Sequence, residues 1–185
     1  MPGRDLKLTV VLISILTCIA SCCGYQFSGE GEGPKPGLRC IAIPVFDNNT
    51  TEPDVGAIFA GALRQEFLQK GNMKVVPVEE AQAVFRGTVK DIRTAAIAHH
   101  PVSVASQRVT VENRLFLTLD IRCEEKGSRK VLWRDANFTY YKVYETENDP
   151  LNPDPIKGFE NRRAAIESLA GDMAIRIHDR FLSNF

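Results

Sequence analysis

The sequence lacks an excess of charge of either sign, and this absence limits its partners. It contains 23 lysines and arginines against 23 aspartates and glutamates, so its formal net charge at pH 7 is zero. No block of basic residues marks a nucleic-acid-binding surface. Beyond residue 20, no apolar run is long enough to cross a bilayer as a helix. We therefore expect no nucleic-acid partner and no transmembrane helix in the body of the chain.

Residue patterns that build catalytic or metal sites are also missing. Of the three histidines, His99 and His100 are adjacent, so on an extended chain they point to opposite sides and make a poor chelating pair. No serine or cysteine has a histidine and an acid at a recognisable spacing, and "RGTVKD" lacks the Gly-Lys-Ser/Thr of a phosphate loop. Scattered carboxylates leave an acid–base pair open, but no pattern indicates one. The sequence predicts no enzyme, no metal and no cofactor.

The start of the chain has the features of an export signal. Arg4 and Lys7 precede an uncharged apolar run at 8–20. As a helix this run would span roughly 20 Å, short of the ~30 Å hydrocarbon core of a bilayer. A basic start, a short apolar core and a small-residue exit indicate a cleaved signal rather than a membrane span.

The exit of this segment, "IASC", resembles the bacterial lipobox, whose cysteine receives lipid while the chain is cut just before it. The resemblance implies a signal peptide at 1–21 and lipid on Cys22. Cys23 is the alternative, although it would place Ala20 where an aliphatic residue is preferred. A plain secretion signal with incidental cysteines remains a third interpretation. An aspartate after the lipid cysteine usually retains such proteins in the inner membrane; Cys23 stands there, which favours an outer-membrane anchor facing the periplasm.

The next segment is expected to connect this anchor to a folded domain. "SGEGEGPKPG" offers almost no apolar side chain to bury, so residues 22–37 are predicted to form the lipidated N-terminus and a flexible tether. Residues 38–185 are long enough for one domain with a core. Within it, Cys40 and Cys123 lie far apart in sequence. A disulfide between them and two buried free thiols are both open.

Hydrophobic periodicity predicts the fold class of this domain. Strict alternation of apolar and polar residues at 109–124 predicts a long strand with one buried face, and "EEKGSRK" predicts a hairpin turn. The other expected elements are strands at 38–46, 73–78, 83–92 and 131–144, a helix from an N-cap at Thr51 to Gly71, a loop or loose strand end at 97–107, a Pro/Asn/Asp loop at 146–155, and a closing helix that buries Phe159 to Phe181. Together they predict an α/β (α+β) two-layer sandwich, with two helices on one face of a mixed four- to five-stranded sheet.

Basic residues form two groups on this predicted domain. Arg86 and Lys90 project from the polar face of one strand, while Arg129 and Lys130 lie at the hairpin turn. The simplest interpretation is a solvated surface, because acidic residues alternate with basic ones elsewhere. The functional interpretation is a patch that meets phosphate groups through charge-assisted hydrogen bonds.

Several segments together resemble the LptE-like family of outer-membrane lipopolysaccharide-assembly lipoproteins. They are "CGYQFSG", "IAIPVFDNNTTEP" leading into a helix, "AVFRGTVKDI", "VLW" and the closing helix that ends at a phenylalanine. The resemblance implies a two-layer α/β plug inside a large LptD-like β-barrel partner, which binds lipopolysaccharide and helps deliver it to the outer leaflet. The family's cysteine-glycine-aromatic start aligns with Cys23 rather than Cys22. No motif transfers lipopolysaccharide contacts, so Arg86, Lys90, Arg129 and Lys130 are candidates on chemistry alone.

Other functions are compatible with parts of the same sequence. The strand "IAIPVF" followed by a helix also resembles other periplasmic lipoprotein domains, some of which regulate cell-wall synthases or form secretion assemblies. A regulator of that kind is the alternative function, and a secreted hydrolase is third. The partner that co-purifies with the chain separates the first two.

Overall fold

The computed structural model describes residues 33–101, 109–148 and 155–183. The expected signal peptide at 1–21, both candidate lipid-attachment cysteines, the first part of the expected tether and residues 149–154 of the expected Pro/Asn/Asp loop lie outside these residues. Within the described part of the chain, no helix is long and apolar enough to span a membrane.

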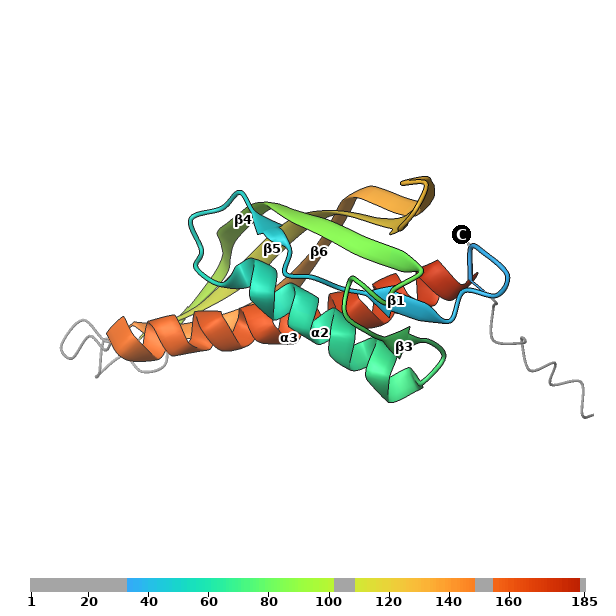
Figure 1. Cartoon of the computed structure of the whole chain (residues 1–185). Coiled ribbons are helices and arrows are strands. Elements are labelled where there is room, and N and C mark those ends of the chain that lie inside the picture. Colours follow the sequence, from blue (N-terminus) through green and yellow to red (C-terminus); the bar gives the residue numbers. More distant parts are fainter. Residues whose placement is uncertain (1–32, 102–108, 149–154, 184–185) are drawn as a thin grey trace, which may run out of the picture. The chain divides into compact units, whose positions relative to one another are not determined.

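The described residues form a mixed six-stranded sheet and two helices (Figure 1). The sheet order is β3-β1-β4-β5-β6, and β2 also pairs with β4. Strands β1, β2 and β3 pair in parallel, whereas β4, β5 and β6 form an antiparallel meander. The elements in chain order are β1 (Cys40–Ala42), β2 (Asp47–Asn48), α2 (Val55–Lys70), β3 (Lys74–Val75), β4 (Ala83–Pro101), β5 (Val109–Glu125), β6 (Val131–Asn148) and α3 (Pro155–Ser183).

This arrangement confirms the predicted α+β sandwich, with a difference in the number of strands. The expected strand at 38–46 is shortened to β1, and an additional short strand, β2, forms just beyond its end, which raises the count above the predicted four to five. Pro44 lies between β1 and β2 and has no N–H to donate to a neighbouring strand, so regular pairing stops there.

The core lies between the two helices and the face of the sheet that they cover (Figure 1). The alternation predicted for the long strand is confirmed, because Leu115, Leu117 and Leu119 of β5 are fully buried. The helices add Val55, Phe59, Leu63 and Phe67 from α2, and Ile166, Leu169, Met173, Ile177 and Phe181 from α3. Burial of each large apolar side chain stabilises the fold by about 1.5–3 kcal/mol, so this layer holds the helices on the sheet.

The N-terminus of α2 differs from the prediction. Asp54, not Thr51, is the N-cap, with φ 59° and no side-chain capping bond. Asn48 closes the preceding loop: its Oδ1 accepts hydrogen bonds from the N–H and hydroxyl of Thr50, and its Nδ2 donates to the carbonyl of Glu52. This closed loop delays the start of the helix. At the other end Gly71 ends α2 as predicted, with φ 72° and its N–H donating to the carbonyl of Phe67.

Two expectations are refined or corrected at the far end of the meander. Of residues 97–107, expected as a loop or a loose strand end, 97–101 continue β4 and pair with β5 as far as Pro101 opposite Val109, and the rest lie outside the described residues. Phe159, expected on the buried face of α3, is 55% exposed. Gly158 faces the sheet instead: a Cβ placed on it would lie 3.8 Å from Thr146 of β6. A helix drifts by about 20° per heptad, so one apolar stripe does not stay on the core along the whole of α3.

Candidate functional site: the uncovered face of the sheet

The opposite face of the meander is covered by no element of the described chain (Figure 1). Side chains alternate across a strand, so the polar positions of β5 that flank its buried leucines all project from this uncovered face. They are Arg114, Phe116, Thr118, Asp120, Arg122 and Glu124. Each is half-buried, because β4 and β6 flank β5 on both sides. This face is the candidate functional site.

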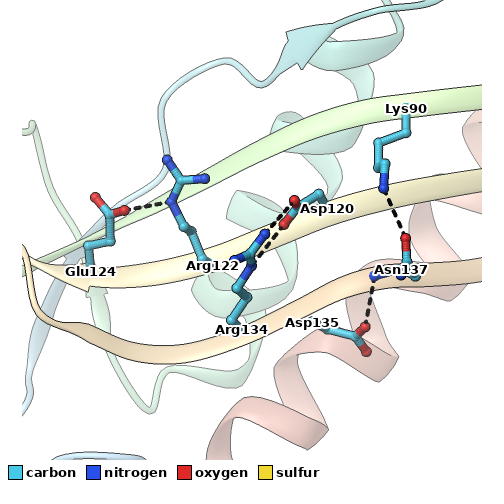
Figure 2. A network of polar contacts seen from close by, with 7 residues as sticks. All are labelled: Lys90, Asp120, Arg122, Glu124, Arg134, Asp135 and Asn137. Atoms are coloured by element: carbon cyan, nitrogen blue, oxygen red, sulfur yellow. Dashed lines mark hydrogen bonds and ion pairs between the residues drawn. The ribbon is translucent and has the colours of Figure 1, made fainter.

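The half of this face next to the hairpin turn is an ion-paired network (Figure 2). Arg122 Nε lies 2.5 Å from Glu124 Oε1, and Arg86 Nε lies 3.3 Å from the other oxygen of the same carboxylate. Arg134 of β6 holds Asp120 of β5 through two hydrogen bonds, of 2.8 and 3.4 Å. Each arginine in this half therefore faces a carboxylate.

The network continues toward α3. Lys90 Nζ donates to Asn137 Oδ1 at 2.9 Å, and the Asn137 N–H donates to Asp135 Oδ1 (Figure 2). Asp135 also forms an ion pair of 2.7 Å with Arg180 of α3. Charge on this half of the face is thus balanced within the domain.

The pKa shifts agree with this balance. The hydrogen bond from Arg122 is the largest influence on Glu124 and, with the charges of Arg122 and Arg86, holds its pKa below the ordinary value, although burial opposes this. The hydrogen bond and charge of Asp120 raise the pKa of Arg134. The arginines of this half are thus held by carboxylates, and the network presents few unsatisfied donors to a ligand.

The structure places the four sequence-predicted basic residues apart from one another. Arg86 and Lys90 are engaged as described above. Arg129 lies in the turn with φ 55°, its N–H donating to the carbonyl of Glu125, and Lys130 follows it. Ala83 pairs with Glu125 and so marks the turn end of β4. Lys90 lies seven residues further along the strand, at a distance of roughly 23 Å from that end. The two pairs do not form a single patch.

The other half of the uncovered face holds a cluster that the sequence reasoning missed. Arg93 of β4, Phe116 of β5 and Tyr141 of β6 are neighbours in one row across the three strands. Arg114, two residues before Phe116, lies opposite Val143 in the next row. We call these five residues the arginine–aromatic cluster. A phenylalanine on the polar face of an alternating strand was the sequence signal that could have revealed it.

Stacking defines the geometry of the cluster. The Arg93 guanidinium carbon lies 4.9 Å from the centre of the Phe116 ring, and that of Arg114 lies 4.6 Å from the centre of the Tyr141 ring. The two rings are 5.8 Å apart. No ion pair joins either arginine to a carboxylate among the described residues. The Nε of Arg114 is buried and has no hydrogen-bond partner.

Other parts of the described chain offer less chemistry. No group of three or more metal-ligating side chains occurs among the described residues. A cleft of about 430 Å³ lies beside the hairpin turn, where Glu125 already binds Lys35 and Ser128. A second, of about 420 Å³, lies between β6 and α3. His178 of α3 is 3% exposed and lies edge-on against Phe67 in the core.

The two cysteines of the domain are free thiols. Cys123 is fully buried, and burial, helped by the charge of Glu124, raises its pKa to about 12. Cys40 is half-buried rather than buried as the free-thiol alternative expected. Cys123 projects into the core and is not available as a nucleophile.

Comparison with known proteins identifies a family. The family model LptE, described as lipopolysaccharide-assembly, matches residues 38–181. No curated protein matches the chain. Solved structures to which the chain shows some similarity include the minor lipoprotein from Acinetobacter baumannii (11% identity, 80% of this chain and 94% of that chain, TM-score 0.45) and the PelC dodecamer from Paraburkholderia phytofirmans (13%, 78% and 89%, 0.46). Another is the uncharacterized lipoprotein B from Nitrosomonas europaea (9%, 87% and 92%, 0.43).

Proposed function

Because the chain belongs to the LptE family of lipopolysaccharide-assembly proteins, we propose that it is an outer-membrane lipoprotein that binds lipopolysaccharide and helps its assembly in the outer leaflet. It does so as a plug-like complex with a large LptD-like β-barrel. The observation that carries the proposal is the family match, which covers the folded domain from Leu38 to Phe181. The chain acts by binding, and the proposal assigns it no catalytic step.

The physical properties of the domain fit this role. The lumen of a large outer-membrane barrel is polar, and a plug within it needs a surface rich in balanced charge. The ion-paired half of the uncovered face has this character, since Arg122 and Arg86 share Glu124 and Arg134 holds Asp120. A lipid on Cys22, with Cys23 as the alternative, would keep the domain at the periplasmic side of the outer membrane.

The experiment is purification of the tagged full-length chain from membranes in a mild detergent, together with depletion of the chain from cells. We expect a large β-barrel protein to co-purify in fixed proportion, and depleted cells to display less lipopolysaccharide at the surface. Normal surface lipopolysaccharide after depletion would contradict the proposal. A penicillin-binding protein co-purifying in place of the barrel would favour a cell-wall regulator.

A further inference from the structure

The uncovered face separates into a half whose charges are satisfied and a half where two arginines form no ion pair with an acid of the described residues. Arg86, Arg122 and Arg134 each lie within ion-pair distance of a carboxylate. Arg93 and Arg114 contact aromatic rings instead. A guanidinium stacked on a ring keeps its N–H groups directed outward from the ring edge, and it has five donors and no acceptor. These two side chains therefore have hydrogen-bonding capacity that the described part of the fold does not use.

The buried Nε of Arg114 is the clearest sign of an unmet partner. Buried polar atoms in folded proteins are almost always hydrogen-bonded, and leaving one unpaired costs about 1–3 kcal/mol. This Nε is fully buried and has no partner. Stacking on Tyr141, with its guanidinium carbon 4.6 Å from the ring centre, holds the side chain in place. A site that is already ordered loses less conformational entropy when an anion binds.

Apolar side chains lie beside these arginines within the cluster, and the acidic residues Asp91, Glu112 and Glu145 stand in the adjoining rows of the sheet. Tyr141 and Val143, neighbours on the same face of β6, are 46% and 44% exposed, and Phe116 lies beside them. An apolar surface adjacent to unpaired guanidiniums fits a ligand that joins a phosphate to an acyl chain, because the phosphate accepts charge-assisted hydrogen bonds while the chain buries apolar area. A free anion would use only half of this surface.

We propose that Arg93 and Arg114 form a binding site for a phosphate group of an acylated glycolipid, and that Tyr141 and Val143 contact its acyl chain. The inference rests on the proposed function and names the residues by which the chain holds the lipid. It is preferred to the pair Arg86 and Lys90 suggested by the sequence, since these two are already engaged by Glu124 and Asn137.

The test measures binding of lipid A, the phosphorylated and acylated anchor of lipopolysaccharide, to the full-length chain in detergent. The probes are lipid A, its enzymatically dephosphorylated form, and inorganic phosphate as a competitor. The variant is Arg93→Gln with Arg114→Gln, and the matched control is Arg86→Gln with Lys90→Gln on the same face. Melting temperatures establish that both variants fold. Arg93→Lys with Arg114→Lys keeps the charge but removes the planar fork of donors.

We expect the Arg93/Arg114 glutamine variant to bind lipid A at least tenfold more weakly, the control to change less than threefold, and the lysine variant to fall between them. The dephosphorylated lipid should bind the wild type and the glutamine variant equally. Unchanged affinity in the glutamine variant, or an equal loss in the control, would show that Arg93 and Arg114 do not bind the phosphate group. Competition by millimolar phosphate would identify a free-anion site and overturn the lipid assignment. If the wild type binds no lipid A, the proposed function itself fails.

Discussion

The ring of Phe46 occupies the space that a side chain at Gly87 would need. A Cβ placed on Gly87 would come within 2.6 Å of carbons of the Phe46 ring, closer than packed carbons approach one another. Phe46 precedes β2, whereas Gly87 lies within β4, so this contact fixes the β1–β2 segment against the meander. Gly56 at the start of α2 is closer still to the same residue, because its Cβ would lie 2.1 Å from the Phe46 carbonyl oxygen.

Gly87→Ala is therefore expected to destabilise the domain. The added methyl group must displace the Phe46 ring in a packed core, which costs about 1–3 kcal/mol. The matched control is Gly61→Ala in α2, where nothing lies within 4 Å of the new Cβ. Alanine there should stabilise the helix by about 0.5–1 kcal/mol. Urea unfolding of both variants checks the prediction, and equal stability would show that Phe46 yields without cost.

Leu117→Asp should unfold the domain, because Leu117 is fully buried in the centre of β5. An unpaired carboxylate in that position costs several kcal/mol, against a total stability of about 5–15 kcal/mol for a domain of this kind. Thr118→Asp is the control, since Thr118 projects from the uncovered face and bonds to Thr139. Circular dichroism melting should show loss of the transition only for Leu117→Asp. A native-like melt for that variant would mean that the face assignment of β5 is wrong.

The two thiols of the domain should differ in reactivity. The pKa of Cys123 is raised from 9.0 to about 12, so at pH 8 it carries almost no thiolate, and it is also buried. Iodoacetamide at pH 8 should alkylate the half-buried Cys40 first and leave Cys123 unmodified, as read by peptide mass spectrometry. In guanidinium chloride both should react. Rapid labelling of Cys123 in the folded chain would contradict its burial.

The same shift has a consequence at alkaline pH. The unfolded chain releases the Cys123 proton near pH 9, whereas the folded chain holds it to about pH 12. The stability due to this thiol is therefore present below pH 9 and is lost as pH rises from 9 to 12.

Glu124 should contribute to the acid limb of the stability profile. Hydrogen bonding from Arg122 lowers the pKa of Glu124 in the folded state. The contribution of Glu124 to the free energy of unfolding is therefore present above the pKa that this residue has in the unfolded chain. It is lost as the pH falls through the lower pKa of the folded chain. The pair is partly exposed, so the effect should stay below about 1 kcal/mol. Glu124→Gln should leave stability less dependent on pH below about 5 than it is in the wild type, as measured by urea unfolding. Identical acid profiles would show that water screens the pair completely.

The anchor prediction concerns the cysteine that follows "IAS". Cys22→Ser should abolish labelling by radioactive palmitate and leave an uncleaved precursor, because the lipid-modified thiol is the substrate for cleavage. Cys23→Ser should be labelled and cleaved normally. Mass spectrometry that finds lipid on Cys23 would reverse this assignment, and lipid on neither cysteine would remove the argument for an outer-membrane location.

Much of the fold was predictable because its signals are local. The alternation along β5 identified the buried set of Leu115, Leu117 and Leu119, and the Gly71 stop of α2 followed from the ease with which glycine adopts positive φ. Long-range geometry was not available in the same way. The delayed start of α2 at Asp54 depends on how Asn48 closes a loop, and the exposure of Phe159 depends on where α3 crosses β6.

For the candidate site, too, the sequence revealed the local pattern but not the long-range contacts. Sequence reasoning selected Arg86 and Lys90 because they share a polar face, but a strand pattern does not reveal which acid lies opposite each base. Only the register of β4 on β5 and β6 brings Glu124 to Arg86 and Asn137 to Lys90. The same register places Arg93 beside Phe116, 23 residues later in the chain, in a contact that no local pattern contains.

What the sequence determined by itself is the class of protein: a lipobox-like start, a neutral body, an α+β pattern and a family resemblance that the match over residues 38–181 supports. These properties depend on residue type and spacing, which are written directly in the chain. The tertiary structure alone decided which charges remain available to a ligand. Ion pairing is a matter of a few ångströms between strands, so two arginines with the same charge as their neighbours differ only because the folded sheet places rings, rather than carboxylates, beside them.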